Sequence, residues 1–142
     1  MLPIQKLFSA NQWIFEINFE GITHEDSLKE MYNCNSANWI LGHLVYTRNA
    51  LLASIDNPPI AGEEMKEVYA RGVVRPDMSK AVELDVLKKK YVDSQPAIMK
   101  GVEQVKDENL LEQLTIFGFH EAYHLGQIGL IRKLLGKEGA IK

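Results

Sequence analysis

The segment from Leu110 to Leu135 reads LLEQLTIFGFHEAYHLGQIGLIRKLL and decides the fold that the sequence predicts. It contains no proline, and its apolar residues recur at the three- and four-residue spacing of an α-helix. Gly136 follows directly and is a typical C-terminal stop signal. We therefore expect one long helix that ends at this glycine.

The same periodicity predicts three more long helices upstream. They cover roughly residues 4–19, 36–55 and 79–105. Pro96 lies inside the third and is expected to kink or split it. A short capped helix is also expected to begin after Thr23.

Residues 57–78 contain three prolines and two glycines, with a possible short helix at 63–69. A connection this long suits two neighbouring helices that run parallel. Strand-type alternation of useful length is absent from the sequence. The predicted fold is therefore all-α: a single domain over residues 1–142, built as a four-helix bundle with a long crossover between its second and third helices.

Composition excludes several classes of protein. The 142 residues carry a formal net charge of −3, so the chain lacks the basic excess of a nucleic-acid-binding protein. Cys34 is the single cysteine, which excludes an internal disulfide and favours a reduced, cytoplasmic setting. We expect no signal peptide and no membrane partner, because neither a basic-then-apolar leader nor eighteen successive apolar residues occur.

His120 and His124 are the first candidate ligands for a metal ion. Four residues apart on the 110–135 helix, they lie on one face and can meet one point. His43 lies at the edge of the apolar stripe of the 36–55 helix. Three imidazoles from two facing helices can hold a divalent ion with a position left for water or substrate. The competing interpretation is that these are core histidines with satisfied rings.

Three neighbours of the histidine pair, Gln127, Tyr123 and Glu121, are weaker candidates for a role in the site, and Glu121 or Tyr123 could carry a proton there. Gln127 could orient a ligand imidazole or a bound water, or it could simply bond backbone in the core. Tyr123 could present its hydroxyl, although packing is the more ordinary role. The remaining histidine, His24, is expected at the surface.

Residues 120–124 also match the HExxH pattern of zinc proteases, in which Glu121 would be the general base. The glycine and third histidine of the extended pattern are replaced by Gln127 and Leu130. Glu121 also lies about 100° around the helix from His120, which predicts a solvated residue. We therefore do not expect a protease.

Two segments together resemble the DinB-like family, which includes bacillithiol- and mycothiol-dependent transferases. Residues 35–49, NSANWILGHLVYTRN, resemble its second-helix signature, and residues 120–128, HEAYHLGQI, resemble its H-x-x-x-H-x-G-Q signature. The resemblance implies an up-down-down-up bundle that is often dimeric. It also implies a divalent metal, commonly nickel or zinc, on His43, His120 and His124.

Other residues have two interpretations each. Arg48 could hold an anionic substrate, but an interhelical ion pair is the preferred prediction. Cys34 could be a reactive thiol or, as preferred here, a small buried residue. Trp13 and Trp39 are expected in the core.

Small residues on the 110–135 helix lie opposite the histidines. They are Gly118, Ala122, Gly126 and Gly129. A neighbouring helix of the bundle or a twofold partner could pack there, and we hypothesise the partner.

Two functional hypotheses follow. The first is a metal-dependent hydrolase or thiol transferase that acts on a small molecule such as a low-molecular-weight thiol. The alternative is a non-enzymatic, dimeric metal-binding or stress-related interaction protein. An open site over the imidazoles would favour the first, and a closed site would favour the second.

Overall fold

The computed structural model describes residues 1–73 and 75–141, and every regular element in them is helical. The elements are α1 (Pro3–Phe19), α2 (His24–Ser27), α3 (Ala37–Ser54), η1 (Glu63–Met65), α4 (Lys66–Tyr69), η2 (Met78–Lys80), α5 (Leu84–Gln104) and α6 (Glu108–Leu134). The predicted all-α class is confirmed. The long helices begin or end within two residues of their predicted bounds, except at the start of α5.

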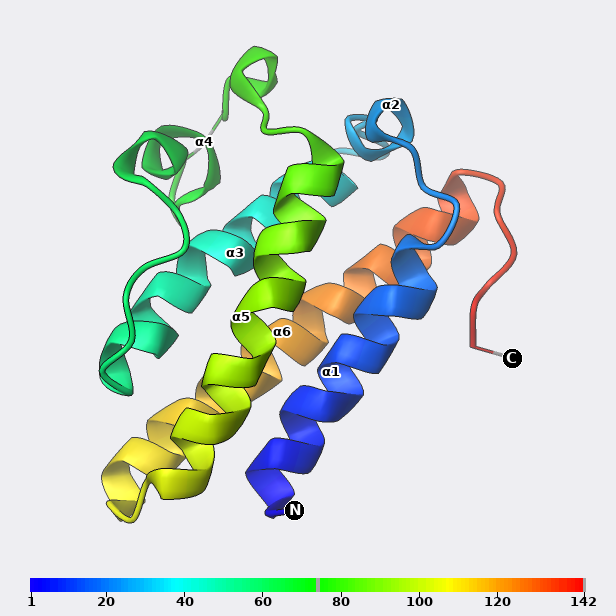
Figure 1. Cartoon of the computed structure of the whole chain (residues 1–142). Coiled ribbons are helices and arrows are strands. Elements are labelled where there is room, and N and C mark those ends of the chain that lie inside the picture. Colours follow the sequence, from blue (N-terminus) through cyan, green and yellow to red (C-terminus); the bar gives the residue numbers. More distant parts are fainter. Residues whose placement is uncertain (74, 142) are drawn as a thin grey trace.

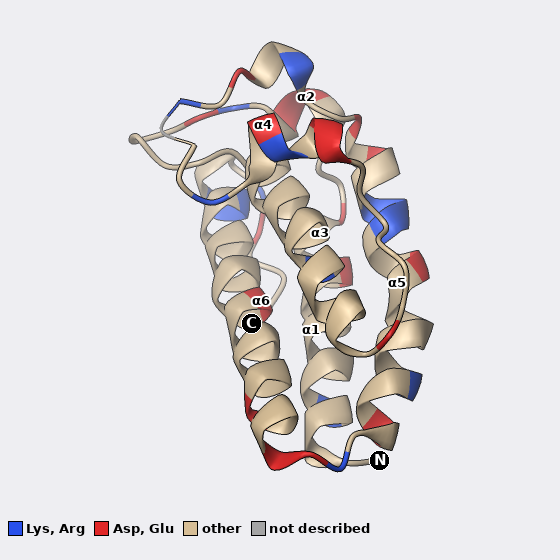
Figure 2. Ribbon diagram, turned by 90° about the vertical axis from the view of Figure 1, so that its left-hand side faces the viewer, with Lys and Arg blue, Asp and Glu red and all other residues tan. Residues whose placement is uncertain are grey.

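Four long helices lie side by side, and the short ones gather at one end (Figure 1). α1 packs along α6 and α5, and α3 packs along the same two helices. α4 packs against α3, and α2 packs against α3 and α5. In Figure 2, α3 and the middle of α6 carry few charged residues. α3 is buried on several sides, whereas the buried residues of α6 form one face of that helix.

The apolar core forms two clusters along the bundle. The larger lies at the end covered by α2 and α4 and includes Phe15, Leu44 and Leu125. The smaller includes Phe8 and Leu52. Each long helix contributes to both clusters, so the polar residues that lie between them form a layer across the bundle.

Capping residues explain the helix limits. The predicted capping box is present: Thr23 Oγ1 accepts from the Asp26 amide at 3.1 Å, and the Asp26 carboxylate accepts from the Thr23 amide at 3.2 Å. Ser36 caps α3 by accepting from the amide of Trp39 at 3.1 Å. Gly136 has φ +82, the left-handed conformation expected after a helix end.

The predicted start of the third helix at residue 79 is wrong. Residues 78–80 form a 3₁₀ turn, and α5 begins at Leu84, whose amide donates to His24 Nδ1 at 3.1 Å. His24 is partly exposed, as expected of a surface residue, and stabilises the start of α5.

Pro96 does not split α5. The helix continues through it from Leu84 to Gln104. Pro96 is exposed, and so is Val92, whose carbonyl loses its helical donor to the proline. Water can satisfy that carbonyl, so the helix does not need to break there.

Among the described helices, none combines the length and the apolar character that a membrane span requires.

Candidate metal centre

His43, His120 and His124 come together where α3 faces α6. One ring nitrogen of each lies within 4.8 Å of the others. The rings stand edge to face, with centroids 5.1 Å apart for His43 with either partner and 4.5 Å for His120 with His124. His43 is buried, and the other two are partly exposed. The predicted convergence of the three imidazoles is confirmed.

Hydrogen bonds fix the protonation of two of the rings. His43 Nδ1 lies 2.9 Å from the carbonyl of Tyr69, and His124 Nδ1 lies 2.7 Å from Gln127 Oε1. Both oxygens can only accept, so each Nδ1 carries the proton and each Nε2 keeps its lone pair. Gln127 thus has the orienting role that the sequence offered as one of its two interpretations.

The donor set of this cluster fits a metal ion. His43 Nε2 and His120 Nε2 are 3.2 Å apart. Two nitrogens bound to one metal at the usual bond length lie about 2.8–3.4 Å apart for angles between 90° and 110°. His120 Nδ1 is the one buried side-chain nitrogen or oxygen in the described chain that has no hydrogen-bond partner. The cluster is therefore not a closed hydrogen-bond network, and its converging lone pairs can hold a cation.

Electrostatics keep the rings neutral, the form that binds metal. Desolvation lowers the pKa of His43 and of His124 below the ordinary value. Desolvation, together with the neighbouring His124 and His43, lowers the pKa of His120 to about 4. Near pH 7 each imidazole therefore has a lone pair available to a metal.

A second set of contacts holds His43 in place. Its ring stacks on Trp39, with centroids 4.9 Å apart and planes 7° from parallel. Trp39 Nε1 donates to the carbonyl of Val68 at 2.7 Å, next to the Tyr69 carbonyl that binds His43. Gly42 allows this approach, because a Cβ there would lie 2.2 Å from the Tyr69 ring. Trp39 is in the core as expected. The contact with Tyr69 was not predicted from the sequence. Gly42, directly before His43, was the available signal that another group packs closely against α3 here.

Two clefts, each of about 440 Å³, reach the histidines from the surface. Both are lined by His43, His120 and Arg71; Trp39, Tyr123 and His124 line one of them, and Thr47 and Phe117 the other. Tyr123 is 58% exposed, so the prediction that it packs is wrong. Its ring centroid lies 5.2 Å from that of His124, at the edge of the cleft.

Glu121 is not the solvated residue that its helical position predicted. It is 3% exposed and paired with Arg48, whose Nε lies 2.6 Å from Glu121 Oε1. The predicted ion pair of Arg48 is confirmed. Because both carboxylate oxygens are engaged by Arg48 and Tyr91 in the core, Glu121 is not free to act as the general base of an HExxH protease.

Two further expectations are wrong, and neither residue lies in the histidine cluster. Cys34 is exposed, in the turn before α3, and Trp13 is 55% exposed on α1. Side-chain type alone favours the interior for both residues, but Trp13 lies on an outward face of α1 and Cys34 lies in the exposed connection before α3.

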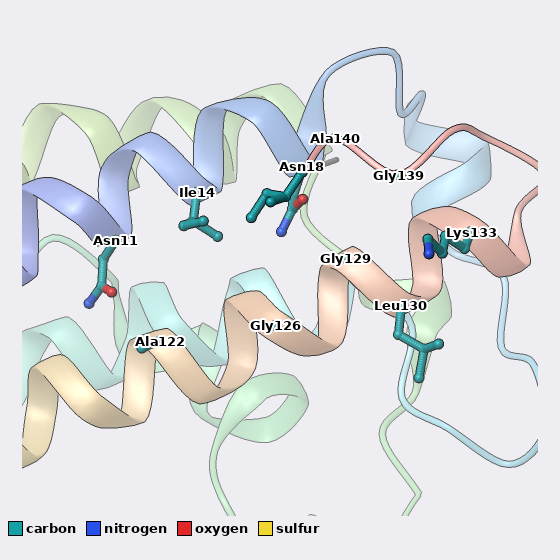
Figure 3. Close-up of a pocket in the computed structure, with 11 residues that line it drawn as sticks. Asn11, Ile14, Asn18, Ala122, Gly126, Gly129, Leu130, Lys133, Gly139 and Ala140 are labelled. Carbon is teal, nitrogen blue, oxygen red and sulfur yellow. The ribbon is translucent and has the colours of Figure 1, made fainter.

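The small-residue face of α6 is covered in part by α1. A Cβ on Gly118 would lie 2.6 Å from Leu7, and Asn18 lies beside Gly129. Gly126 has open space, and Figure 3 shows it in the hollow of about 390 Å³ between α6 and α1. A neighbouring helix of the same chain therefore fills only part of this face.

Comparison of the chain with protein-family models, with curated proteins and with solved structures finds no match. The functional argument therefore depends on the geometry of the site.

Proposed function

We propose that the chain is a DinB-like metal protein in which His43, His120 and His124 bind nickel or zinc, and that it acts as a metal-dependent hydrolase or thiol transferase. The observation that carries the proposal is the convergence of three neutral imidazoles beneath open clefts. Three imidazoles suit either ion, since both accept nitrogen ligands. In the described chain no other histidine, cysteine or carboxylate joins the cluster, which leaves positions for exogenous ligands.

A bound divalent ion would lower the pKa of a water or thiol at such an open position. The chain's own residues prepare the site for that chemistry. The Tyr69 carbonyl and the Gln127 side chain orient two ligand rings. Tyr123 brings a phenol to the edge of the cleft, where it is our candidate for moving a proton.

The alternative is a non-enzymatic, dimeric metal-binding or stress-related interaction protein. Exposed apolar residues on α6 favour it: Ile116, Phe119, Leu130 and Leu134. The clefts over the imidazoles favour the enzyme, because a purely structural metal site is usually closed by a fourth protein ligand. We therefore prefer a small-molecule substrate such as a low-molecular-weight thiol.

The proposal extends to topology and location. The order of the four long helices would be up-down-down-up, with residues 57–78 as the crossover. The chain would act in the cytoplasm, where its exposed Cys34 would stay reduced.

Metal analysis of protein purified without a histidine tag tests the proposal. Wild type should retain close to one divalent ion per chain, and His124→Ala should lose most of it. His24→Ala is the matched control, since this histidine lies outside the cluster and should leave metal content unchanged. Equal metal in wild type and His124→Ala would contradict the assignment of ligands.

The proposed homodimer is tested separately. Gly126 faces open space, so a partner helix could pack there. Wild type should elute as a dimer in gel filtration, and Gly126→Leu should shift toward monomer. Monomer elution of both proteins would remove the dimer from the proposal.

A further inference from the structure

Arg71 is the charged residue shared by the two clefts over the histidines. Thirteen described residues line these clefts, and Arg71 is the one among them whose side chain carries a permanent charge. Neither aspartate nor glutamate is among them. A ligand that enters either cleft therefore meets one positive charge and no compensating negative one.

The Arg71 side chain is exposed and has no bonded partner in the part of the chain that the structure describes. It makes neither an ion pair nor a hydrogen bond with any described residue, whereas Arg48 and Arg132 are both engaged. Its charge nevertheless lies beside the site, since Arg71 lines both clefts together with His43 and His120. The five N–H donors of this side chain are thus available to a ligand beside the imidazoles.

The backbone before Arg71 is anchored to α3. The carbonyl of Val68 accepts from Trp39 and that of Tyr69 accepts from His43, so two successive peptide groups are held by the site itself. Gly72, with φ +89, then turns the chain. These contacts therefore hold the Arg71 backbone close to the histidine site, although Arg71 lies in an irregular connection.

We propose that Arg71 binds the carboxylate of a small substrate whose other end reaches the histidine cluster. This inference rests on the proposed function and narrows its substrate class to small monocarboxylates, including thiols that carry a carboxylate. The guanidinium fork matches the two oxygens of a carboxylate. A single cation also suits a single negative charge better than a phosphate, which usually draws several donors or a helix N-terminus.

Thiol binding to the cobalt-loaded protein tests this proposal, because thiolate ligation changes the visible spectrum of cobalt(II). The probes are 3-mercaptopropionate, its neutral isostere 3-mercaptopropanamide, and the cationic thiol cysteamine. Wild type should bind the carboxylate about fivefold more tightly than the amide and bind cysteamine most weakly. Added salt should reduce these differences.

Two variants assign the effect to one side chain. Arg71→Gln should bind the carboxylate and the amide with equal affinity. Arg75→Gln, an exposed arginine of the same connection that lines neither cleft, should keep the wild-type preference. Equal binding of the two thiols by wild type, or a preference that survives in Arg71→Gln, would overturn the role of Arg71 alone. Failure of wild type to take up cobalt would instead overturn the proposed function, and this inference with it.

Discussion

The Glu121 carboxylate accepts two hydrogen bonds from the Arg48 guanidinium, from Nε to Oε1 at 2.6 Å and from Nη2 to Oε2 at 3.1 Å. Arg48 lies five residues after His43 on α3, and Glu121 directly follows His120 on α6. The pair therefore joins the two ligand-bearing helices next to the histidines. A shift of one helix along the other would separate both the ion pair and the imidazoles.

The remaining donors of Arg48 are also satisfied. Nη1 donates to the Tyr91 carbonyl at 2.6 Å and to Ser94 Oγ at 2.7 Å, and Nη2 donates to Gln95 Oε1 at 3.0 Å. The guanidinium carbon lies 3.6 Å from the centre of the Tyr91 ring. This polar layer separates the two apolar clusters, and a fully bonded layer favours one register of the helices over others.

Arg48→Met should destabilise the protein by about 3–5 kcal/mol, because it leaves the buried Glu121 carboxylate without its cation. Urea unfolding followed by circular dichroism measures this change. The double variant Arg48→Met/Glu121→Leu should recover part of the loss, since no charge is then buried alone. A single variant within about 1 kcal/mol of wild type would show that the pair does not stabilise the fold.

Gly42→Ala should destabilise the protein by about 1–3 kcal/mol, because the new methyl group would overlap the buried Tyr69 ring. It should also weaken metal binding, since the Tyr69 carbonyl orients His43. Gly126→Ala is the control: its Cβ meets nothing within 4 Å, so alanine should be neutral or slightly stabilising there. Equal behaviour of the two variants in thermal unfolding would refute the packing argument.

Gln127→Leu should weaken metal affinity about 10- to 100-fold while the protein stays folded. The leucine removes the oxygen that accepts from His124 Nδ1, so this ring loses its fixed orientation. Competition with a metal-binding dye measures the affinity. Gln104→Leu, at the exposed end of α5, should leave affinity unchanged. If both variants bind metal like wild type, Gln127 does not orient the ligand.

Alkaline pH should unfold the protein partly through Tyr91. Burial, together with the nearby Glu121 carboxylate, raises the pKa of Tyr91 well above its ordinary value of 10.0. A raised pKa in the folded state means that this contribution to stability is complete below pH 10 and is lost as the pH rises further. Tyrosinate absorbance from Tyr91 should therefore appear together with the loss of the helical circular dichroism signal.

Tyr91→Phe checks that assignment. The phenylalanine removes the ionising group. The free energy of unfolding of this variant should therefore fall less between pH 7 and alkaline pH than that of wild type. Stability at pH 7 should itself fall, because Glu121 loses the hydrogen bond from the Tyr91 hydroxyl. If all the tyrosines ionise while the helical signal is intact, the burial argument for Tyr91 fails.

Local signals in the sequence determined the helices and the part of the site that lies on α6. Apolar periodicity, the Thr23–Asp26 capping box and Gly136 act within a few residues, so the limits that they predict agree with the structure except at the start of α5. The shared face of His120 and His124 follows from helical geometry alone.

Apart from the predicted meeting of His43 with the α6 histidines, only the tertiary structure decided which groups meet across helices. Helical periodicity predicts a solvated Glu121, because the buried cation that pairs with it, Arg48, is 73 residues away on another helix. Periodicity within one helix contains no information about such a partner. The same holds for the Tyr69 carbonyl on His43, for the exposure of Trp13 and Cys34, and for Arg71 above the imidazoles. These depend on how the long helices and their connection pack, because desolvation and charge pairing are properties of the assembled fold.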